Sequence, residues 1–65
     1  MKYLNQAIAL SRQDHVTLND LRTYDALLAK ARGDEANQIG DLYSTLISLA
    51  TPEDYAQFIA ETETD

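Results

Sequence analysis

Apolar residues recur along the chain at intervals of three and four, which is the spacing of one face of an α-helix. The chain contains only two glycines and one proline, and no stretch alternates β-branched with polar residues. Nothing in the pattern therefore predicts a strand. The intervals instead indicate four helices, at about residues 2–13, 18–32, 35–50 and 52–62. We predict an all-α protein, a compact bundle of four short helices that forms a single domain over residues 1–65.

Two of the predicted helices have well-marked starts. Thr17 is placed to accept a backbone N–H as an N-cap, and Asp20 stands three residues later, where a capping box has its acid. Thr51 and Pro52 mark the start of the last helix, because threonine caps helices and proline fits the first helical position. Since Pro52 also disfavours helical backbone at Thr51, we expect a sharp corner between the third and fourth helices.

The remaining boundaries depend on glycines and on the acidic C-terminal residues. Gly33 predicts a left-handed turn that joins the second and third helices into a central αα-hairpin, with Asp34 capping the third. Gly40 lies inside the third helix, where it predicts either close packing against another helix or a frayed first turn and a half. Residues 61–65 contain no apolar side chain, so we predict a frayed acidic tail.

The two central helices carry apolar faces wider than a small bundle needs. At 100° per residue, each face spans roughly 160–180°, whereas a core-facing stripe needs somewhat more than about 100°. A 65-residue chain also buries only about 60% of its unfolded surface. We therefore expect the excess to face another protein or a second copy in a homodimer, with a monomer as the alternative. The predicted interface residues are Tyr24, Leu27, Tyr43 and Ile47.

Charge divides the chain into a basic and an acidic half. Residues 1–32 hold all five Lys and Arg residues with three acids, whereas residues 33–65 hold eight acids and no cation, and the net charge is −6. Two interpretations are open. The halves can neutralise each other, within a monomer or across an antiparallel dimer, or the charge difference can serve to bind a charged partner. We favour neutralisation, because surface charge usually serves solubility.

Nucleic-acid binding is not favoured by the placement of the charges. The helix after Gly33, which would be the recognition helix of a helix-turn-helix, carries Asp34, Glu35 and Asp41 and no cation. A dimeric nucleic-acid-binding regulator is kept as an alternative, and it would use Arg12, Arg22, Lys30 and Arg32. An acidic mimic of nucleic acid is a further alternative, although most acids of the second half lie at helix starts or in the tail.

Residues that could support catalysis are few. The chain has no cysteine and one histidine, His15, which we interpret as a solvated residue in the first connection beside Asp14. No motif has the spacing of a metal site or a phosphate-binding loop. Adjacent acids at the helix starts point about 100° apart, so they do not converge on one ion. We expect no enzymatic activity, no cofactor and no metal.

These observations lead to one function class and one expected location. No apolar run reaches the roughly 18–20 residues of a membrane span, and residues 1–12 lack the pattern of a secretory signal. We therefore expect a cytoplasmic protein without membrane contact. The leading hypothesis is a small acidic helical protein-binding module, a regulator, adaptor or inhibitor of a larger protein. Accessory genes of phages, plasmids and operons encode modulators of this kind.

Overall fold

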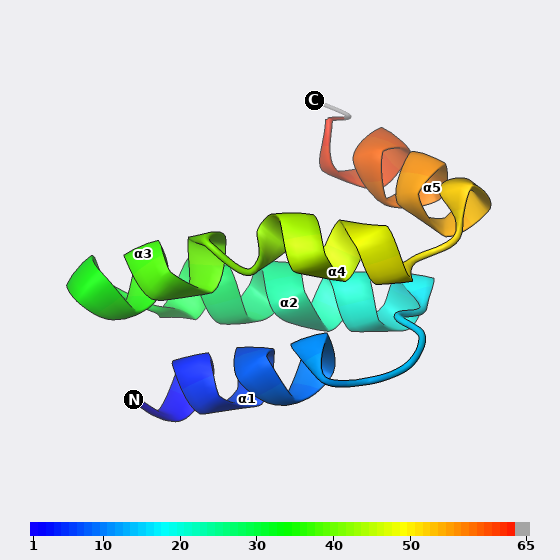
Figure 1. The fold of residues 1–65 in the computed structure, drawn as a ribbon. Coiled ribbons are helices and arrows are strands. Elements are labelled where there is room, and N and C mark those ends of the chain that lie inside the picture. The colour runs from blue at the N-terminus through cyan, green and yellow to red at the C-terminus, as the bar shows by residue number, and fades with distance from the viewer. Residues whose placement is uncertain (64–65) are drawn as a thin grey trace.

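Five helices with short connections make up residues 1–63, which are the residues that the computed structural model describes (Figure 1). The helices are α1 (Lys2–Ser11), α2 (Leu18–Lys30), α3 (Gly33–Gly40), α4 (Tyr43–Leu49) and α5 (Pro52–Thr62). Within residues 1–63, extended pairing is limited to an isolated parallel bridge between Val16 and Ala50. The predicted all-α bundle is confirmed, and α3 and α4 together take the place of the third predicted helix.

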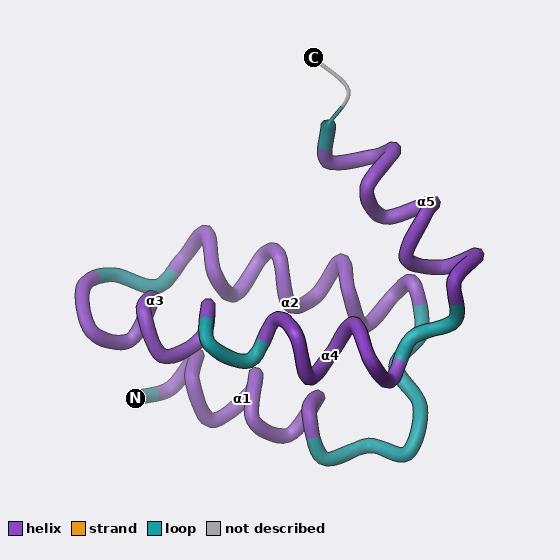
Figure 2. The backbone as a smooth tube through the Cα atoms, turned by 45° about the horizontal axis from the view of Figure 1, so that its top comes forward, coloured by secondary structure: helices purple, strands orange, loops and turns teal. Residues whose placement is uncertain are grey.

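The third predicted helix is divided by a short bend at Asp41 and Leu42 (Figure 2). Both residues keep right-handed helical backbone, and the Leu42 N–H donates to the Ile39 carbonyl at 3.0 Å, a bond that spans three residues instead of four. Gly40 is the last residue of α3. A Cβ atom at this position would have no neighbouring atom within 4 Å. Neither close packing nor a frayed start explains this glycine, so both predictions for Gly40 are wrong.

The predicted start signals operate as expected at two helices. The Thr17 hydroxyl accepts the Asp20 N–H at 3.2 Å, and the Asp20 carboxylate accepts the Thr17 N–H at 3.0 Å, which completes the capping box of α2. The Thr51 hydroxyl accepts the Asp54 N–H at 3.1 Å, with Pro52 at the first position of α5. Only the two residues Ala50 and Thr51 separate α4 from α5, so the corner is as sharp as predicted.

The central hairpin turns at Gly33, although the neighbouring boundaries differ from the prediction. Gly33 has a φ of 57°, the left-handed conformation that we predicted. Helix α2 ends at Lys30 rather than residue 32, because Ala31 and Arg32 adopt extended backbone before the turn. The N-cap of α3 is Arg32 without a side-chain hydrogen bond, which corrects the prediction of a cap at Asp34. Helix α1 likewise ends two residues early, at Ser11.

Two carboxylates of the acidic half cap helices of the basic half. An oxygen of Glu35 accepts the backbone N–H groups of Tyr3 at 2.8 Å and of Leu4 at 3.0 Å, in the first turn of α1. An oxygen of Asp54 accepts the N–H of Leu18, the first residue of α2, at 3.2 Å. Helix N-termini carry unpaired N–H groups and partial positive charge, so they attract anionic side chains. These contacts hold α3 against α1 and α5 against α2.

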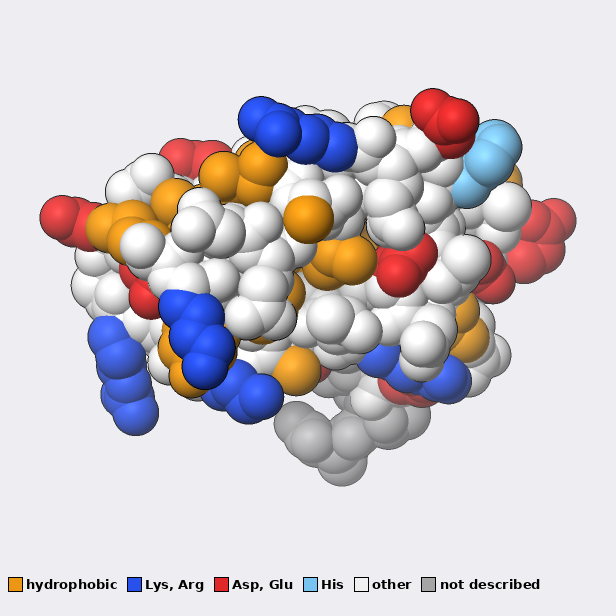
Figure 3. Space-filling model, turned by 90° about the horizontal axis from the view of Figure 1, so that it is seen from below, with side chains coloured by type: hydrophobic (Ala, Val, Ile, Leu, Met, Phe, Trp, Pro, Cys, Tyr) orange, Lys and Arg blue, Asp and Glu red, His pale blue; other side chains and the backbone are white. Residues whose placement is uncertain are grey.

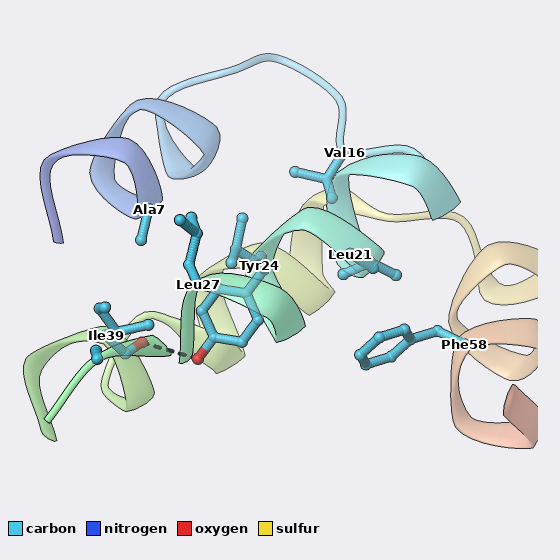
Figure 4. Close-up of a cluster of buried hydrophobic side chains, with 9 residues drawn as sticks. Ala7, Val16, Leu21, Tyr24, Leu27, Ile39 and Phe58 are labelled. Atoms are coloured by element: carbon cyan, nitrogen blue, oxygen red, sulfur yellow. Dashed lines mark hydrogen bonds between the residues drawn. The ribbon is translucent and has the colours of Figure 1, made fainter. Parts of the chain in front are cut away.

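Helix α2 lies at the centre of the core. Helices α1, α3 and α5 all pack against it, so its apolar side chains are covered from several directions (Figure 4). The chain exposes 4308 Å² of surface, close to the roughly 4,200 Å² typical of a folded protein of this mass. The buried residues are Ala7, Val16, Leu21, Tyr24, Leu27, Ala31, Ile39, Leu46 and Phe58. A single chain therefore buries most of the apolar helix surface that we expected to remain exposed.

The last helix extends into the predicted tail. Glu61 and Thr62 belong to α5, and the Thr62 hydroxyl donates to the Phe58 carbonyl at 3.0 Å. The predicted end of the last helix at residue 62 is therefore confirmed, and fraying of residues 61–65 stays a prediction. The last part of that range, residues 64–65, lies outside the described residues.

Candidate protein-binding surface

Two of the four predicted interface residues lie inside the chain. Tyr24 is 2% exposed and Leu27 is 4% exposed, which corrects the prediction that they face a partner. The Tyr24 hydroxyl donates to the Ile39 carbonyl at 2.8 Å, and Leu27 lies between Ala7 and Ile39 (Figure 4). The physical reason is the central position of α2. Several helices pack around it and bury the whole of a wide apolar face, whereas a single neighbour would cover only part of that face.

The other two predicted residues remain half-exposed and belong to a larger surface. Tyr43 and Ile47 lie one turn apart on α4, and Tyr55 and Ile59 lie one turn apart on α5; all four are half-buried. Tyr55 contributes to the raised pKa of Tyr43, which relates the two pairs. We call Tyr43, Ile47, Tyr55 and Ile59 the α4–α5 patch. Tyr55 and Ile59 were not singled out from the sequence, and Ile59, like Tyr43 and Ile47, also packs against the core.

Tyr43 is the most constrained member of the α4–α5 patch. Its ring lies 6.1 Å from that of Tyr24, centroid to centroid, at an interplanar angle of 37°. Burial raises the pKa of Tyr43 to about 12, and the neighbouring Tyr55 acts in the same direction. The hydroxyl therefore stays protonated at neutral pH and is available to donate or accept a hydrogen bond at the edge of the patch.

The charges of three exposed carboxylates influence the pKa values of Tyr24 and Tyr43. Burial raises the pKa of Tyr24, and the nearby charges of Asp25 and Asp41 raise it further. The charge of Glu63 acts on Tyr43 in the same way, after the larger effects of burial and of Tyr55. We call Asp25, Asp41 and Glu63 the acidic rim. Its members come from α2, from the α3–α4 bend and from the C-terminal end of α5.

The basic residue nearest in sequence to this region, Arg22 of α2, is already paired. Its Nε donates to one carboxylate oxygen of Glu61 at 2.9 Å, and its Nη2 donates to the other at 2.5 Å. The hydrogen bond with Arg22 lowers the pKa of Glu61 to about 2, and a second bond from Gln57 adds to the effect. Since residues 33–65 contain no Lys or Arg, the acidic rim has no basic residue on α3, α4 or α5.

The four basic residues of the nucleic-acid alternative do not form one surface. Arg12 follows the end of α1, whereas Lys30 and Arg32 flank the turn at the far end of α2, about 20 Å away along that helix. Arg22 is paired with Glu61. Figure 3, seen from below, shows some Lys and Arg side chains gathered at one end and others apart from them. The structure does not assemble the continuous basic face that phosphate binding needs.

The acidic-mimic alternative gains no support either, because several acids bind within the chain. Asp20 completes the capping box, Glu35 and Asp54 cap other helices, and Glu61 pairs with Arg22. A mimic needs a row of carboxylates that faces outward in place of phosphates, and these four carboxylates are engaged.

The described residues offer no enclosed site for a small molecule. Residues 1–63 contain no pocket and no group of three or more His, Asp or Glu side chains placed to hold a metal ion. His15 is exposed in the segment between α1 and α2. The absence of enzymatic activity stays a prediction. Among the helices of residues 1–63, none combines the length and the apolar character needed to cross a membrane.

No protein-family model, curated protein or solved structure matches this chain. Function is therefore inferred from the arrangement of the residues themselves.

Proposed function

We propose that this chain is a small acidic protein-binding module that acts as a regulator, adaptor or inhibitor of a larger protein. The observation that carries the proposal is the α4–α5 patch, in which Tyr43, Ile47, Tyr55 and Ile59 remain half-exposed on two helices that meet at a sharp corner. Figure 1 shows α5 turning away from the direction of α4 at this corner, while α5 stays packed against α2.

The composition of the patch suits protein recognition. Tyrosine provides apolar area together with a hydroxyl that forms hydrogen bonds, and it is enriched among the residues that dominate binding energies. The Tyr43 ring also lies beside the Tyr24 ring before any partner arrives. Binding then loses little side-chain freedom, which is the main advantage of a preformed surface.

Site-specific photo-crosslinking in cells that produce the chain tests the proposal. A photoreactive amino acid is placed at Ser44 on α4 or at Ala56 on α5, two exposed positions beside the patch. The control position is Gln6, which is exposed on α1, across α2 from α5 (Figure 1). We expect one discrete protein adduct from Ser44 and Ala56 and none from Gln6.

The same experiment on an Ile47→Ser, Ile59→Ser double variant links the adduct to the patch. Both side chains are half-buried, so circular dichroism first establishes that the variant keeps its helices. We expect the adduct to disappear in this variant. Adducts that form equally from Gln6, or that persist without the two isoleucines, would contradict the proposal.

A further inference from the structure

Helix α5 is attached to the rest of the chain mainly through one other helix. Helices α1 and α3 pack against each other and against α2, and α1 also packs on α4, whereas the main contact of α5 is with α2. Figure 1 shows α5 at one end of the molecule, oblique to α4. If α5 left α2, the contacts among the other helices would stay in place.

The link between α4 and α5 is short and is fixed on its core side. The Val16 N–H donates to the Leu49 carbonyl at 3.1 Å, which ties the end of α4 to the segment before α2. Only Ala50 and Thr51 follow before α5 begins. Thr51 caps α5 and Pro52 occupies its first position, so the start of α5 is set by its own residues. Ala50 and Thr51 are therefore placed to act as a hinge.

One aromatic side chain supplies the buried contact of α5. Phe58 is the residue of this helix that is buried, and its ring points towards Leu21 of α2 (Figure 4). Tyr55 and Ile59, which lie three residues before Phe58 and one after it, are half-buried. The apolar attachment of α5 therefore depends on one ring and a few partly covered side chains.

Two polar contacts on either side of Phe58 add to this attachment. Near the hinge, the Asp54 carboxylate accepts the Leu18 N–H at 3.2 Å. Towards the C-terminal end of α5, Arg22 pairs with Glu61, and these side chains are 52% and 32% exposed. Exposed ion pairs contribute little net stability, because water already solvates both charges. These contacts orient α5 on α2 but add little to its attachment.

We infer that α5 is a latch, which opens from α2 as a unit while α1, α2, α3 and α4 stay folded. The chain turns at Ala50 and Thr51, and the opening uncovers Leu21 and Phe58. Elements that make few buried contacts open at a lower free energy than the rest of a domain. A helix of 11 residues is marginal in water by itself, so α5 also loses helical structure when it leaves α2.

Opening of the latch would switch the proposed binding surface. The α4–α5 patch takes Tyr43 and Ile47 from α4, and Tyr55 and Ile59 from α5. The complete patch therefore exists only in the closed state, and a partner that needs both pairs shifts the equilibrium towards that state. This consequence rests on the proposed function, whereas the latch itself rests on the packing of α5.

Native-state amide hydrogen exchange of the full chain, followed by NMR at several low urea concentrations, tests the latch. We expect amides in the middle of α5 to be protected at least about tenfold less than those of α2, because they exchange from a lower-energy open state. Their exchange should also depend less on urea, since the opening exposes less surface than complete unfolding. Equal protection and equal urea dependence in the two helices would overturn the inference.

Ile39→Val separates opening of the latch from complete unfolding. Ile39 is buried in α3, at the other end of the core from Phe58 (Figure 4). Loss of one methylene there should accelerate exchange in α2 about two- to tenfold, and should leave exchange in α5 unchanged.

The matched variant Phe58→Leu should accelerate exchange in both helices, because the contacts of Phe58 are lost in the open state and in the unfolded chain alike. Equal acceleration of α5 by Ile39→Val would overturn the latch, because α5 would then open only when the whole chain unfolds.

A tether across the latch gives a second test. The chain has no cysteine, so Arg22→Cys and Glu61→Cys can be joined by a short bis-maleimide, with the same variant capped by N-ethylmaleimide as the control. We expect the tether to slow exchange in α5 to the level of α2. Exchange in α5 that stays as fast as in the control would overturn the inference. A confirmed latch without photo-crosslinked adducts at the patch would contradict the proposed function alone.

Discussion

The carboxylate of Glu35 stabilises a helix other than its own. Glu35 lies in the first turn of α3, where an acidic side chain suits the dipole of its own helix. Its oxygen nevertheless accepts the N–H groups of Tyr3 and Leu4, more than thirty residues away in sequence. Sequence patterns reveal caps supplied within a few residues, whereas a cap from a distant helix depends on how the helices pack.

Replacing this carboxylate should therefore weaken α1. We expect Glu35→Ala to lower the free energy of unfolding by about 1 kcal/mol, the usual cost of losing an N-terminal cap. Asp34→Ala is the matched control, because Asp34 is exposed in the same turn and is also acidic. Urea denaturation measures both variants, and amide hydrogen exchange at Tyr3 and Leu4 should accelerate only in Glu35→Ala. Equal losses from the two variants would contradict the proposed cap.

The two glycines should respond to alanine in opposite directions. Gly40 ends α3 in open space without a positive φ, so Gly40→Ala should raise the free energy of unfolding by about 0.5–1 kcal/mol. Gly33 has a φ of 57°, so Gly33→Ala should lower it by about 1–2 kcal/mol. Thermal denaturation separates them, since about 1 kcal/mol shifts the midpoint by roughly 4–8 °C in a domain of this size. A shift in the same direction for both would contradict this account of the turn.

At the scale of elements, local signals predicted where most helices begin, and packing decided where they end. Thr17 with Asp20 and Thr51 with Pro52 act through bonds within three residues, so the sequence alone revealed them. The break at Asp41 and Leu42 was signalled only by Gly40, which was misinterpreted because the apolar pattern continues from Ile39 through Leu49. Both residues at the break keep helical backbone, so the interval of apolar residues hardly changes across it.

The contact between α2 and α5 should depend on pH. The pKa of Glu61 is about 2, below its ordinary 4.5, because Arg22 and Gln57 bind the carboxylate. The ion pair of the folded chain therefore contributes stability that is fully present above pH 4.5 and is lost as the pH falls towards 2. Arg22→Gln should move the Glu61 titration, followed by NMR of its carboxyl carbon, back towards the ordinary value. Arg12→Gln is the control, and an unchanged Glu61 titration in Arg22→Gln would contradict the ion pair.

At the scale of the whole molecule, the position of α2 explains why the wide apolar faces did not become an interface at Tyr24 and Leu27. The sequence gives the width of an apolar face but not the number of helices that cover it. Three helices, α1, α3 and α5, pack against α2, whereas a helix in a regular four-helix bundle has two close neighbours. Half-buried apolar side chains remain on α4 and α5, as they do at the outer faces of α1 and α2.

The oligomeric state tests this view of the molecule directly. A standard interface buries about 800 Å² on each partner, which would be nearly a fifth of the 4308 Å² that the chain exposes. Among residues 1–63, Met1 is the large apolar side chain that is exposed, so a dimer would have to rely on half-buried side chains. We expect sedimentation equilibrium to give a monomer of 7.3 kDa at high micromolar concentration. Because repulsion between two chains of net charge −6 is screened by salt, any weak dimer should strengthen with ionic strength. A dimer that is tight at low salt would contradict both the repulsion and the coverage of the central helix.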